Sequence, residues 1–213
     1  EVSVRPCDLS SLSNVEDLCD ALLNNETQID VLVNNAGIVE HGSFVQIQPN
    51  EHQRIVQLNV CAITSLLAYL LPPMVARGKG RVLNVASLGA FQPLPSVATY
   101  AATKAFVLSL SEALAEEVRG TGVTVTAVCP GLTATNMVAG AQKKSPALRR
   151  IPRFVFADAR TGAQKAFVAC HNGDALLVPG LKNNLASVLS RATPKWLVRI
   201  ITGLVGRATL PRY

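Results

Sequence analysis

Tyr100 and Lys104 are residues whose types and spacing could carry out acid/base chemistry. The segment around them, 96–120, has apolar side chains at helical intervals, so we expect a helix there. Residues four positions apart on a helix share a face, which makes the phenol and the ammonium neighbours. A nearby cation favours the phenolate and lowers the phenol pKa from its usual value of about 10. Such a pair could exchange a proton with a carbonyl oxygen while a hydride moves on or off its carbon. A solvent-exposed pair is the other interpretation.

The elements that must position this pair follow an alternating pattern. Short apolar runs alternate with longer helical patterns, which predicts βαβ units and a parallel sheet, and hence the α/β fold class. The candidate strands are residues 2–6, 29–34, 80–86, 124–129 and 175–178, and the candidate helices are residues 15–24, 49–76, 100–119 and 159–169.

Small, polar and turn-forming residues follow the predicted strands. Ligands of open parallel sheets bind beyond the carboxyl ends of the strands. Ser87 follows one strand and lies thirteen residues before Tyr100, so the residues with chemical potential collect at the expected edge. The residues that follow the strands are Asp8, Asn35-Ala36-Gly37, Ser87 and Pro130-Gly131.

Length and charge indicate one domain with a basic extension. With 213 residues, the chain can bury a sizeable core, and we assign residues 1–193 to one domain and residues 194–213 to an extension. Residues 1–142 carry 7 Lys/Arg and 12 Asp/Glu, a net charge of −5, whereas residues 143–213 carry 13 and 2, a net charge of +11. The basic part is a solvated surface or attracts an anionic partner such as membrane headgroups. Nucleic acid is disfavoured, because no aromatic side chains interleave with these charges.

Two segments near the carboxyl end have alternative interpretations. Residues 139–156 are basic and interrupted by prolines, which is typical of a loop over a site or of an ordinary surface excursion. Residues 194–207 place apolar side chains, among them Trp196 and Ile200, on one helical stripe with basic residues outside it. A basic amphipathic helix lies on a membrane surface or packs on the protein.

The cysteines and histidines show no metal-ligand spacing. Five scattered Cys, most of them in apolar surroundings, fit core packing in a reducing compartment, so we expect a cytoplasmic protein without a metal site.

Five motifs in register resemble the short-chain dehydrogenase/reductase family. They are Asn34-Asn35-Ala36-Gly37 after a strand, Asn59 within the next helix, Ser87 after the following strand, Tyr100-x-x-x-Lys104, and Pro130-Gly131 after another strand. The order and spacing match from about residue 2 to residue 178. The resemblance implies a Rossmann-like, doubly wound parallel sheet that binds NADP or NAD, with NADP slightly favoured.

The resemblance also implies roles for individual residues. Tyr100 would be the general acid or base, Ser87 would hold the carbonyl oxygen, and Lys104 would lower the phenol pKa and bind the nicotinamide ribose. Asn59 would hold a water that links Lys104 to solvent.

Further positions match the family's cofactor contacts. Besides Tyr100 and Lys104, they are Asp8, Asn35, Ala36, Gly37, Pro130, Gly131, Thr133 and Thr135. Asp8 could instead be a helix cap, and Thr135 could equally be an N-cap.

The likeness extends to substrate and assembly. The segments 84–87 and 100–106 are similar to long-chain 3-oxoacyl and hydroxysteroid reductases, which implies a lipid-like carbonyl or alcohol substrate. Members of the family usually form dimers, here expected through the helices 49–76 and 100–119, or tetramers.

One family feature is missing from the sequence. The family begins with a strand, a Gly-rich turn and a helix whose N-terminus holds the pyrophosphate, and no Gly-x-x-x-Gly-x-Gly segment occurs here. We therefore expect a fold that lacks the first βαβ unit, as part of an active enzyme. The alternative is a shortened, non-catalytic fragment that acts at most as a binding or interaction module.

Overall fold

The fold is one parallel sheet with helices on both faces. The computed structural model describes residues 2–24, 28–133 and 156–194, together with 196–198, 200 and 202–203. The four strands are all parallel and are hydrogen-bonded in the order β1-β2-β3-β4. They are β1 (Val31–Asn34), β2 (Gly80–Val85), β3 (Val123–Val128) and β4 (Leu176–Leu177).

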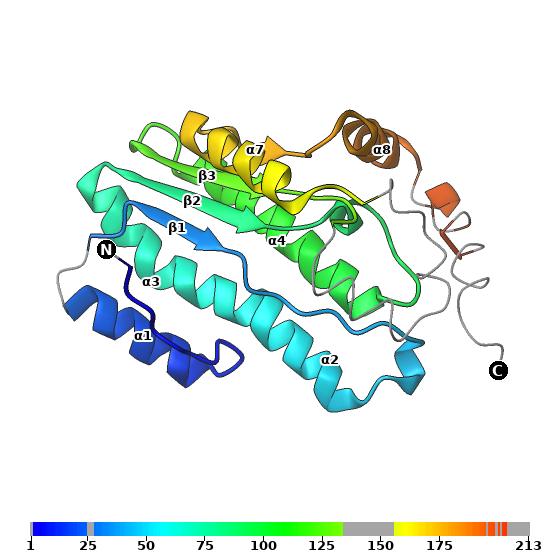
Figure 1. The fold of residues 1–213 in the computed structure, drawn as a ribbon, viewed down its shortest axis with the longest axis horizontal. Helices are drawn as coiled ribbons and strands as arrows, with labels where there is room; N and C mark the ends of the chain where they lie inside the picture. The colour runs from blue at the N-terminus through cyan, green and yellow to red at the C-terminus, as the bar shows by residue number, and fades with distance from the viewer. Residues whose placement is uncertain are drawn as a thin grey trace.

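The helices form two layers around this sheet, as Figure 1 shows. Buried side chains of α3 and α4 pack against one face of β2 and β3, and α1 lies on α3. On the opposite face α7 packs through Ala166 and Cys170. The helical elements are α1 (Leu12–Asn24), η1 (Phe44–Gln46), α2 (Pro49–Val56), η2 (Gln57–Cys61), α3 (Ala62–Arg77), η3 (Leu88–Phe91), α4 (Ala98–Glu117), α7 (Ala159–Asn172) and α8 (Leu181–Ala192).

The predicted α/β class is confirmed, and four of the five predicted strands form within two residues of their expected ends. The predicted strand 2–6 is wrong, because residues 2–8 have no regular structure. Val2 and Val4 are 89% and 80% exposed, so the alternating pattern buries neither face. A strand also needs a neighbour to complete its hydrogen bonds, and the sheet described here begins at β1.

The predicted helix 49–76 forms, but it is not uniformly α-helical. A π-helical turn, η2, separates α2 from α3 and contains the buried Asn59. The whole helix from Pro49 to Arg77 is long and apolar enough to cross a membrane by length and composition alone. Its place in the fold gives a simpler reason for that composition, since it packs on both α1 and the sheet. The buried apolar residues of this helix are Ile55, Ala62, Ile63, Leu66, Leu67, Leu70, Leu71 and Met74.

A chain of buried amides and a hydroxyl joins the sheet to α4. The Asn34 Nδ2 group of β1 donates to the Asn84 Oδ1 atom of β2 at 2.8 Å, and the Asn84 Nδ2 group donates to the Ser111 hydroxyl at 2.9 Å. Ser111 in turn donates to the Val107 carbonyl within its own helix. Because polar atoms removed from water need partners, this chain fixes one register of α4 on the strands.

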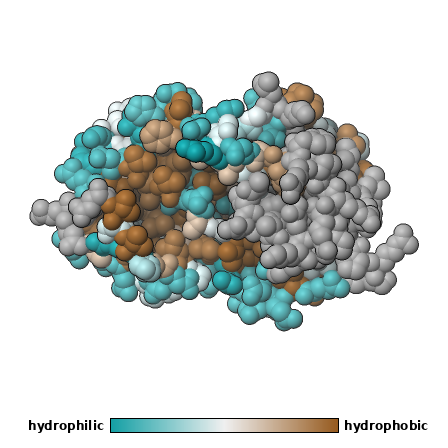
Figure 2. All heavy atoms as spheres, in the orientation of Figure 1, coloured by the Kyte–Doolittle hydropathy of each residue, from teal (hydrophilic) through white to brown (hydrophobic). Residues whose placement is uncertain are grey.

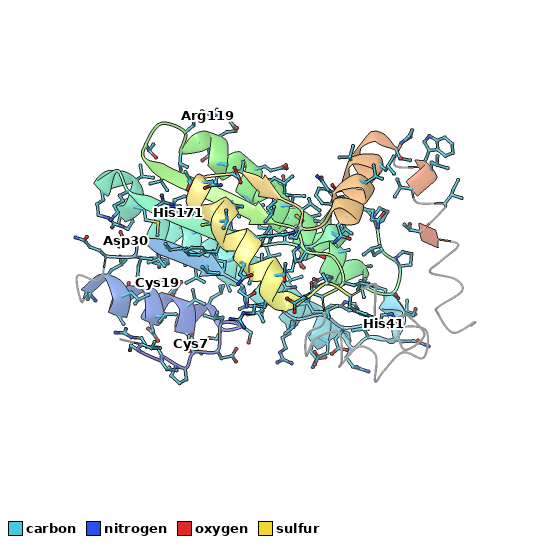
Figure 3. The ribbon with its side chains drawn as sticks, turned by 45° about the horizontal axis from the view of Figure 1, so that its top comes forward. Cys7, Cys19, Asp30, His41, Arg119 and His171 are labelled. Carbon is cyan, nitrogen blue, oxygen red and sulfur yellow. The ribbon has the colours of Figure 1, made fainter. Side chains whose placement is uncertain are left out.

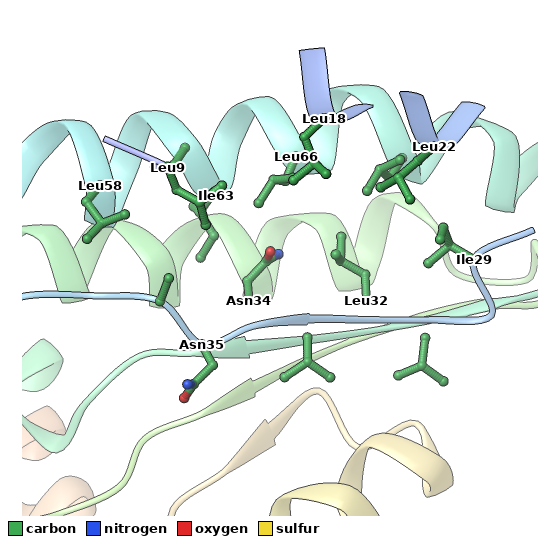
Figure 4. Close-up of a pocket in the computed structure, with 15 residues that line it drawn as sticks. Leu9, Leu18, Leu22, Ile29, Leu32, Asn34, Asn35, Leu58, Ile63 and Leu66 are labelled. Carbon is green, nitrogen blue, oxygen red and sulfur yellow. The ribbon is translucent and has the colours of Figure 1, made fainter. Parts of the chain in front are cut away.

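The strand β1 presents an open edge. Val31 and Val33 are 43% and 52% exposed, and Figure 2 shows apolar surface over this part of the sheet. Along this edge, a groove of about 270 Å³ opens between α1, α3 and β1, and Val31 and Val33 are among the residues that line it (Figure 4). Parallel strands are normally covered on both faces. The described part of β1 is therefore less covered than the other strands of its sheet.

The carboxyl-terminal segments are described in part. Residues 139–155 of the expected loop and residues 204–207 of the expected amphipathic helix lie outside the described residues. Trp196, Val198 and Ile200 are helical, with Val198 buried and the other two exposed. The helix α8 was not expected from the sequence.

Replacing Ser111 with Ala tests the polar chain. The change leaves the buried Asn84 Nδ2 group without its acceptor, so we expect the free energy of unfolding to fall by about 1–3 kcal/mol. Urea unfolding followed by circular dichroism measures it. Ser109→Ala, an exposed position on the same helix, is the matched control and should change stability by less than about 0.5 kcal/mol. Equal stabilities for the two variants would show that the chain contributes nothing.

Candidate active site

Ser87 lies where the β2–β3 pairing continues beyond the strands. The Ala86 N–H donates to the Val128 carbonyl at 2.8 Å, and the Leu88 N–H donates to the Pro130 carbonyl at 2.9 Å. These two bonds bracket Ser87 and hold its backbone at the carboxyl edge of the sheet. The Ser87 hydroxyl accepts from the Gly89 N–H at 3.1 Å, which also starts η3. Ser87 is thus both a turn residue and a fixed polar group.

Lys104 is a buried cation that ties α4 to the end of β2. Lys104 is only 4% exposed, and its Nζ atom donates a hydrogen bond to the Val85 carbonyl at 2.7 Å. Burial lowers the Lys104 pKa to about 8, an effect partly offset by Cys129 nearby. Desolvation disfavours the charged form of an amine. The Lys104 ammonium therefore loses its proton closer to neutral pH than an exposed lysine does.

Tyr100 lies between Ser87 and Lys104. The Lys104 Nζ is 5.9 Å from the centre of the Tyr100 ring, which confirms the shared helix face. Burial raises the Tyr100 pKa, and a hydrogen bond with the Ser87 side chain partly opposes that rise. Desolvation of the phenolate by burial is the largest cause of the rise. Lys104 is not among the causes of this shift, so the effect of Lys104 on the phenol pKa stays a prediction.

Asn59 is held by the backbone of the segment after β1. Its Oδ1 atom accepts from the Ile38 N–H and its Nδ2 group donates to the Ile38 carbonyl, both at 2.9 Å. The Nδ2 group also donates to the Thr103 hydroxyl at 3.1 Å. The π-helical turn aims this side chain at α4, and such turns occur often at functional sites.

Thr103 is a site residue that the sequence reasoning missed. Its hydroxyl donates to the Tyr100 carbonyl at 2.7 Å and accepts from Asn59, so it links two of the predicted catalytic residues. A hydroxyl three residues after Tyr100 on a helix commonly bonds back to the preceding turn, and that signal could have identified it. No sequence pattern indicated that the Val85 carbonyl accepts a hydrogen bond from Lys104.

Glycines bring the backbone close to this group. A Cβ atom built on Gly37 would lie 3.3 Å from both the Asn59 Oδ1 and the Lys104 Nζ atoms, so a larger residue would displace one of them. A Cβ on Gly131 would meet the Asn183 side chain at 2.7 Å. The exposed Asn35 and Ala36 continue this edge, and in Figure 4 Asn35 points to the opposite side of the strand from Asn34. Asn35, Ala36 and Gly37 thus form a ledge after β1, and the backbone of Gly37 lies directly beside Asn59 and Lys104.

The other predicted cofactor contacts have different positions. The Asp8 carboxylate accepts from the Ser10 N–H at 3.0 Å and from the Ser10 hydroxyl at 2.7 Å, and these bonds lower its pKa. Asp8 thus forms a turn before α1, and its carboxylate bonds Ser10 rather than the first N–H groups of the helix, so the structure does not show the helix cap that the alternative interpretation expected. The Thr133 hydroxyl donates to the Gly131 carbonyl at 3.0 Å. Thr135 lies outside the described residues.

The labelled Cys19, His41 and His171 lie on different parts of the fold in Figure 3. Among the residues that the structure describes, no three His, Cys, Asp or Glu side chains come together in a way that could hold a metal ion.

Comparison with known proteins identifies the family. The family model for short chain dehydrogenases matches residues 1–146, more than half of the chain. The chain belongs to the short-chain dehydrogenase family. This confirms the resemblance found in the five sequence motifs, and those motifs meet at one edge of the sheet.

Curated relatives include reductases and dehydrogenases. The ketoacyl reductase HetN from Nostoc sp. is 35% identical over 147 residues, which are 68% of this chain and 51% of that protein. The 3alpha-hydroxysteroid dehydrogenase from Mediterraneibacter gnavus is 41% identical over 111 residues, which are 52% of this chain and 44% of that protein. The chain spans about half the length of the curated relatives it matches.

Solved structures share the fold. A short-chain dehydrogenase from Sphingobium yanoikuyae, solved in complex with NADPH, superposes with a TM-score of 0.74 at 28% identity. The superposition covers 97% of this chain and 76% of that one. The Rossmann-like, doubly wound architecture predicted from the motifs is confirmed by this similarity.

The lowered pKa of Lys104 predicts a pH-dependent stability. The folded state releases this proton at about pH 8 and the unfolded state at about pH 10.5, so between these values the unfolded state binds more protons and stability rises with pH. From pH 8 to about pH 9.5, we expect the chain to gain about 2 kcal/mol relative to Lys104→Met. Urea unfolding of both proteins across this range measures the difference. Parallel pH curves would contradict a desolvated Lys104.

Proposed function

We propose that this chain is part of an NAD(P)-dependent oxidoreductase that interconverts a carbonyl and a secondary alcohol, with Tyr100 as the acid/base. The observation that carries the proposal is the group of Ser87, Tyr100 and the buried Lys104 at the carboxyl edge of a parallel sheet. The Ser87 side chain is close enough to the Tyr100 phenol to lower its pKa, and the Lys104 Nζ lies 5.9 Å from the centre of the phenol ring.

The protonation states suit carbonyl reduction. A phenol whose pKa is raised by burial is neutral at pH 7 and can donate its proton to a carbonyl oxygen as that oxygen gains negative charge. The Ser87 hydroxyl donates a second hydrogen bond to the same oxygen. In the oxidising direction the phenolate must accept the alcohol proton, and a protonated Lys104 favours that form.

A nicotinamide cofactor supplies or accepts the hydride when bound. The ledge of Asn35, Ala36 and Gly37, the turn at Pro130 and Gly131, and Thr133 would hold it, with Asp8 and Thr135 as further proposed contacts. An ammonium carries three donors, so the Val85 bond still permits Lys104 to bind a ribose hydroxyl. We favour NADP over NAD, which agrees with the NADPH complex of the Sphingobium relative.

The proposed substrate is apolar or lipid-like, of the ketoacyl or ketosteroid type. Support comes from the names of the Nostoc and Mediterraneibacter relatives, a ketoacyl reductase and a hydroxysteroid dehydrogenase. The apolar segment 88–97, which begins directly after Ser87, is the part of this chain that such a substrate would contact.

Assembly and location follow as parts of the same proposal. We propose a cytoplasmic homodimer or homotetramer that contacts membrane surfaces through its basic carboxyl end. The exposed Trp196 and Ile200 support the membrane contact, because aromatic and aliphatic side chains beside basic residues insert at the headgroup boundary.

Tyr100→Phe tests the proposed acid/base. Without the hydroxyl no proton can reach the carbonyl oxygen, so we expect kcat to fall by about 10²- to 10⁴-fold. Cofactor binding, measured by fluorescence of the reduced nicotinamide, should change by less than about threefold, because the ring remains. Tyr69→Phe, at an exposed tyrosine of α3, is the matched control with unchanged kcat. A Tyr100→Phe enzyme with wild-type kcat would exclude Tyr100 as the acid.

A panel of carbonyl compounds tests the substrate class. The protein that contains this chain should reduce 3-oxoacyl thioesters or ketosteroids with kcat/KM at least about tenfold above that for small polar sugars. An apolar substrate gains free energy by leaving water, whereas a sugar does not. Cofactor oxidation at 340 nm measures each rate. Activity on small polar sugars alone would exclude a lipid-like substrate.

The alternative, a non-catalytic fragment that acts as a binding module, makes a different prediction. It requires that the protein bind a partner or ligand while no carbonyl compound in the panel is turned over. All four predicted catalytic residues are present, and this favours the enzyme.

A further inference from the structure

The first turn of α4 carries Tyr100 but has weak local support. Its N-cap residue is Val97, whose side chain cannot accept a hydrogen bond from the free N–H groups of the turn. The preceding residue, Ser96, has a φ angle of 72°, in the left-handed region that costs a non-glycine residue about 1 kcal/mol or more. Contacts from elsewhere in the fold must therefore hold this backbone in place.

Those contacts come from the segment between Gly42 and His52. The Gly42 N–H donates to the Ser96 carbonyl at 2.9 Å. The His52 Nδ1 atom of α2 lies 2.8 Å from the Thr99 hydroxyl in the first turn of α4. The segment thus contacts the residues just before Tyr100 at two points, one backbone and one side chain.

The hydrogen bonds fix the tautomer of His52. Its Nε2 atom is 3.0 Å from the Phe44 carbonyl, which can only accept, so Nε2 carries the proton of the neutral ring. The Nδ1 atom is then the acceptor, and Thr99 donates to it. The ring also stacks on Phe44, with centroids 4.2 Å apart. Three contacts hold the imidazole, so it is a fixed acceptor for Thr99.

We propose that His52 is a positioning residue, which holds the Tyr100 phenol against Ser87 through the Thr99 hydroxyl. This inference rests on the proposed function, since it concerns the same acid/base. Thr99 directly precedes Tyr100 in the chain, so a shift of the first turn displaces the phenol from the carbonyl oxygen. Displacement of a reacting group by about 1 Å can cost about 10²-fold in rate.

Two replacements of His52 separate its two hydrogen bonds. His52→Asn places an amide near the Nδ1 position and can still contact Thr99, whereas His52→Gln reaches toward the Nε2 position and contacts Phe44 instead. Both remove the stacked ring. Thr99→Val removes the hydroxyl at nearly constant volume, and Thr99→Ser restores it. Gln53→Ala, at the exposed neighbouring position, is the control.

We expect His52→Gln and Thr99→Val each to lower kcat by about 10- to 100-fold with less than about a threefold change in KM. The double variant should be no slower than the worse single variant, because both remove the same bond. His52→Asn and Thr99→Ser should recover most of kcat. Equal losses for His52→Asn and His52→Gln, or wild-type kcat for Thr99→Val, would overturn the proposal.

Hydrogen exchange keeps this test separate from the proposed function. Backbone amides of residues 98–104 should exchange faster in His52→Gln and Thr99→Val than in the wild-type protein, but not in His52→Asn, and mass spectrometry measures this without a substrate. If the wild-type protein turned over no carbonyl compound, the proposed function would fail while this readout still decided the role of His52. Unchanged exchange in His52→Gln and Thr99→Val would overturn that role.

Discussion

The bond from the Lys104 ammonium to the Val85 carbonyl is the interaction on which the site depends. It joins the second turn of α4 to the last residue of β2 at 2.7 Å, in a place almost closed to solvent. Ser87 follows β2 by two residues and Tyr100 precedes Lys104 by one helical turn. Once this bond forms, the hydroxyl and the phenol must therefore face each other. The same burial that fixes the geometry also lowers the Lys104 pKa and raises the Tyr100 pKa.

The rest of the fold supports this contact by satisfying buried polar groups. The hydrogen-bonded side chains of Asn34, Asn84 and Ser111 fix α4 on β1 and β2. Asn59 joins the segment after β1 to Thr103 on the same helix. Each of these bonds would leave a costly unpaired group if α4 slid by one residue, so together they specify a single register.

The edge of the sheet at β1 is less well covered than the strands that hold the site. Its exposed valines and the groove beneath α1 leave apolar surface that a parallel sheet normally covers. The chain spans about half the length of the curated relatives it matches, and about three quarters of the Sphingobium structure. The acid/base group lies in the well-packed part, between β2, β3 and α4, rather than at this edge.

The sequence by itself determined the α/β class, four strands, the helix face shared by Tyr100 and Lys104, and the position of Ser87 after a strand, because these follow from local periodicity and spacing. The sequence wrongly predicted a strand at residues 2–6, because an alternating pattern does not show whether a neighbouring strand is present to pair with it. Only the tertiary structure decided the pKa directions, the π-helical turn at Asn59, and the contacts of Thr103 and His52. Those depend on burial and on groups 44 to 47 residues apart in the chain, whose approach no local pattern encodes.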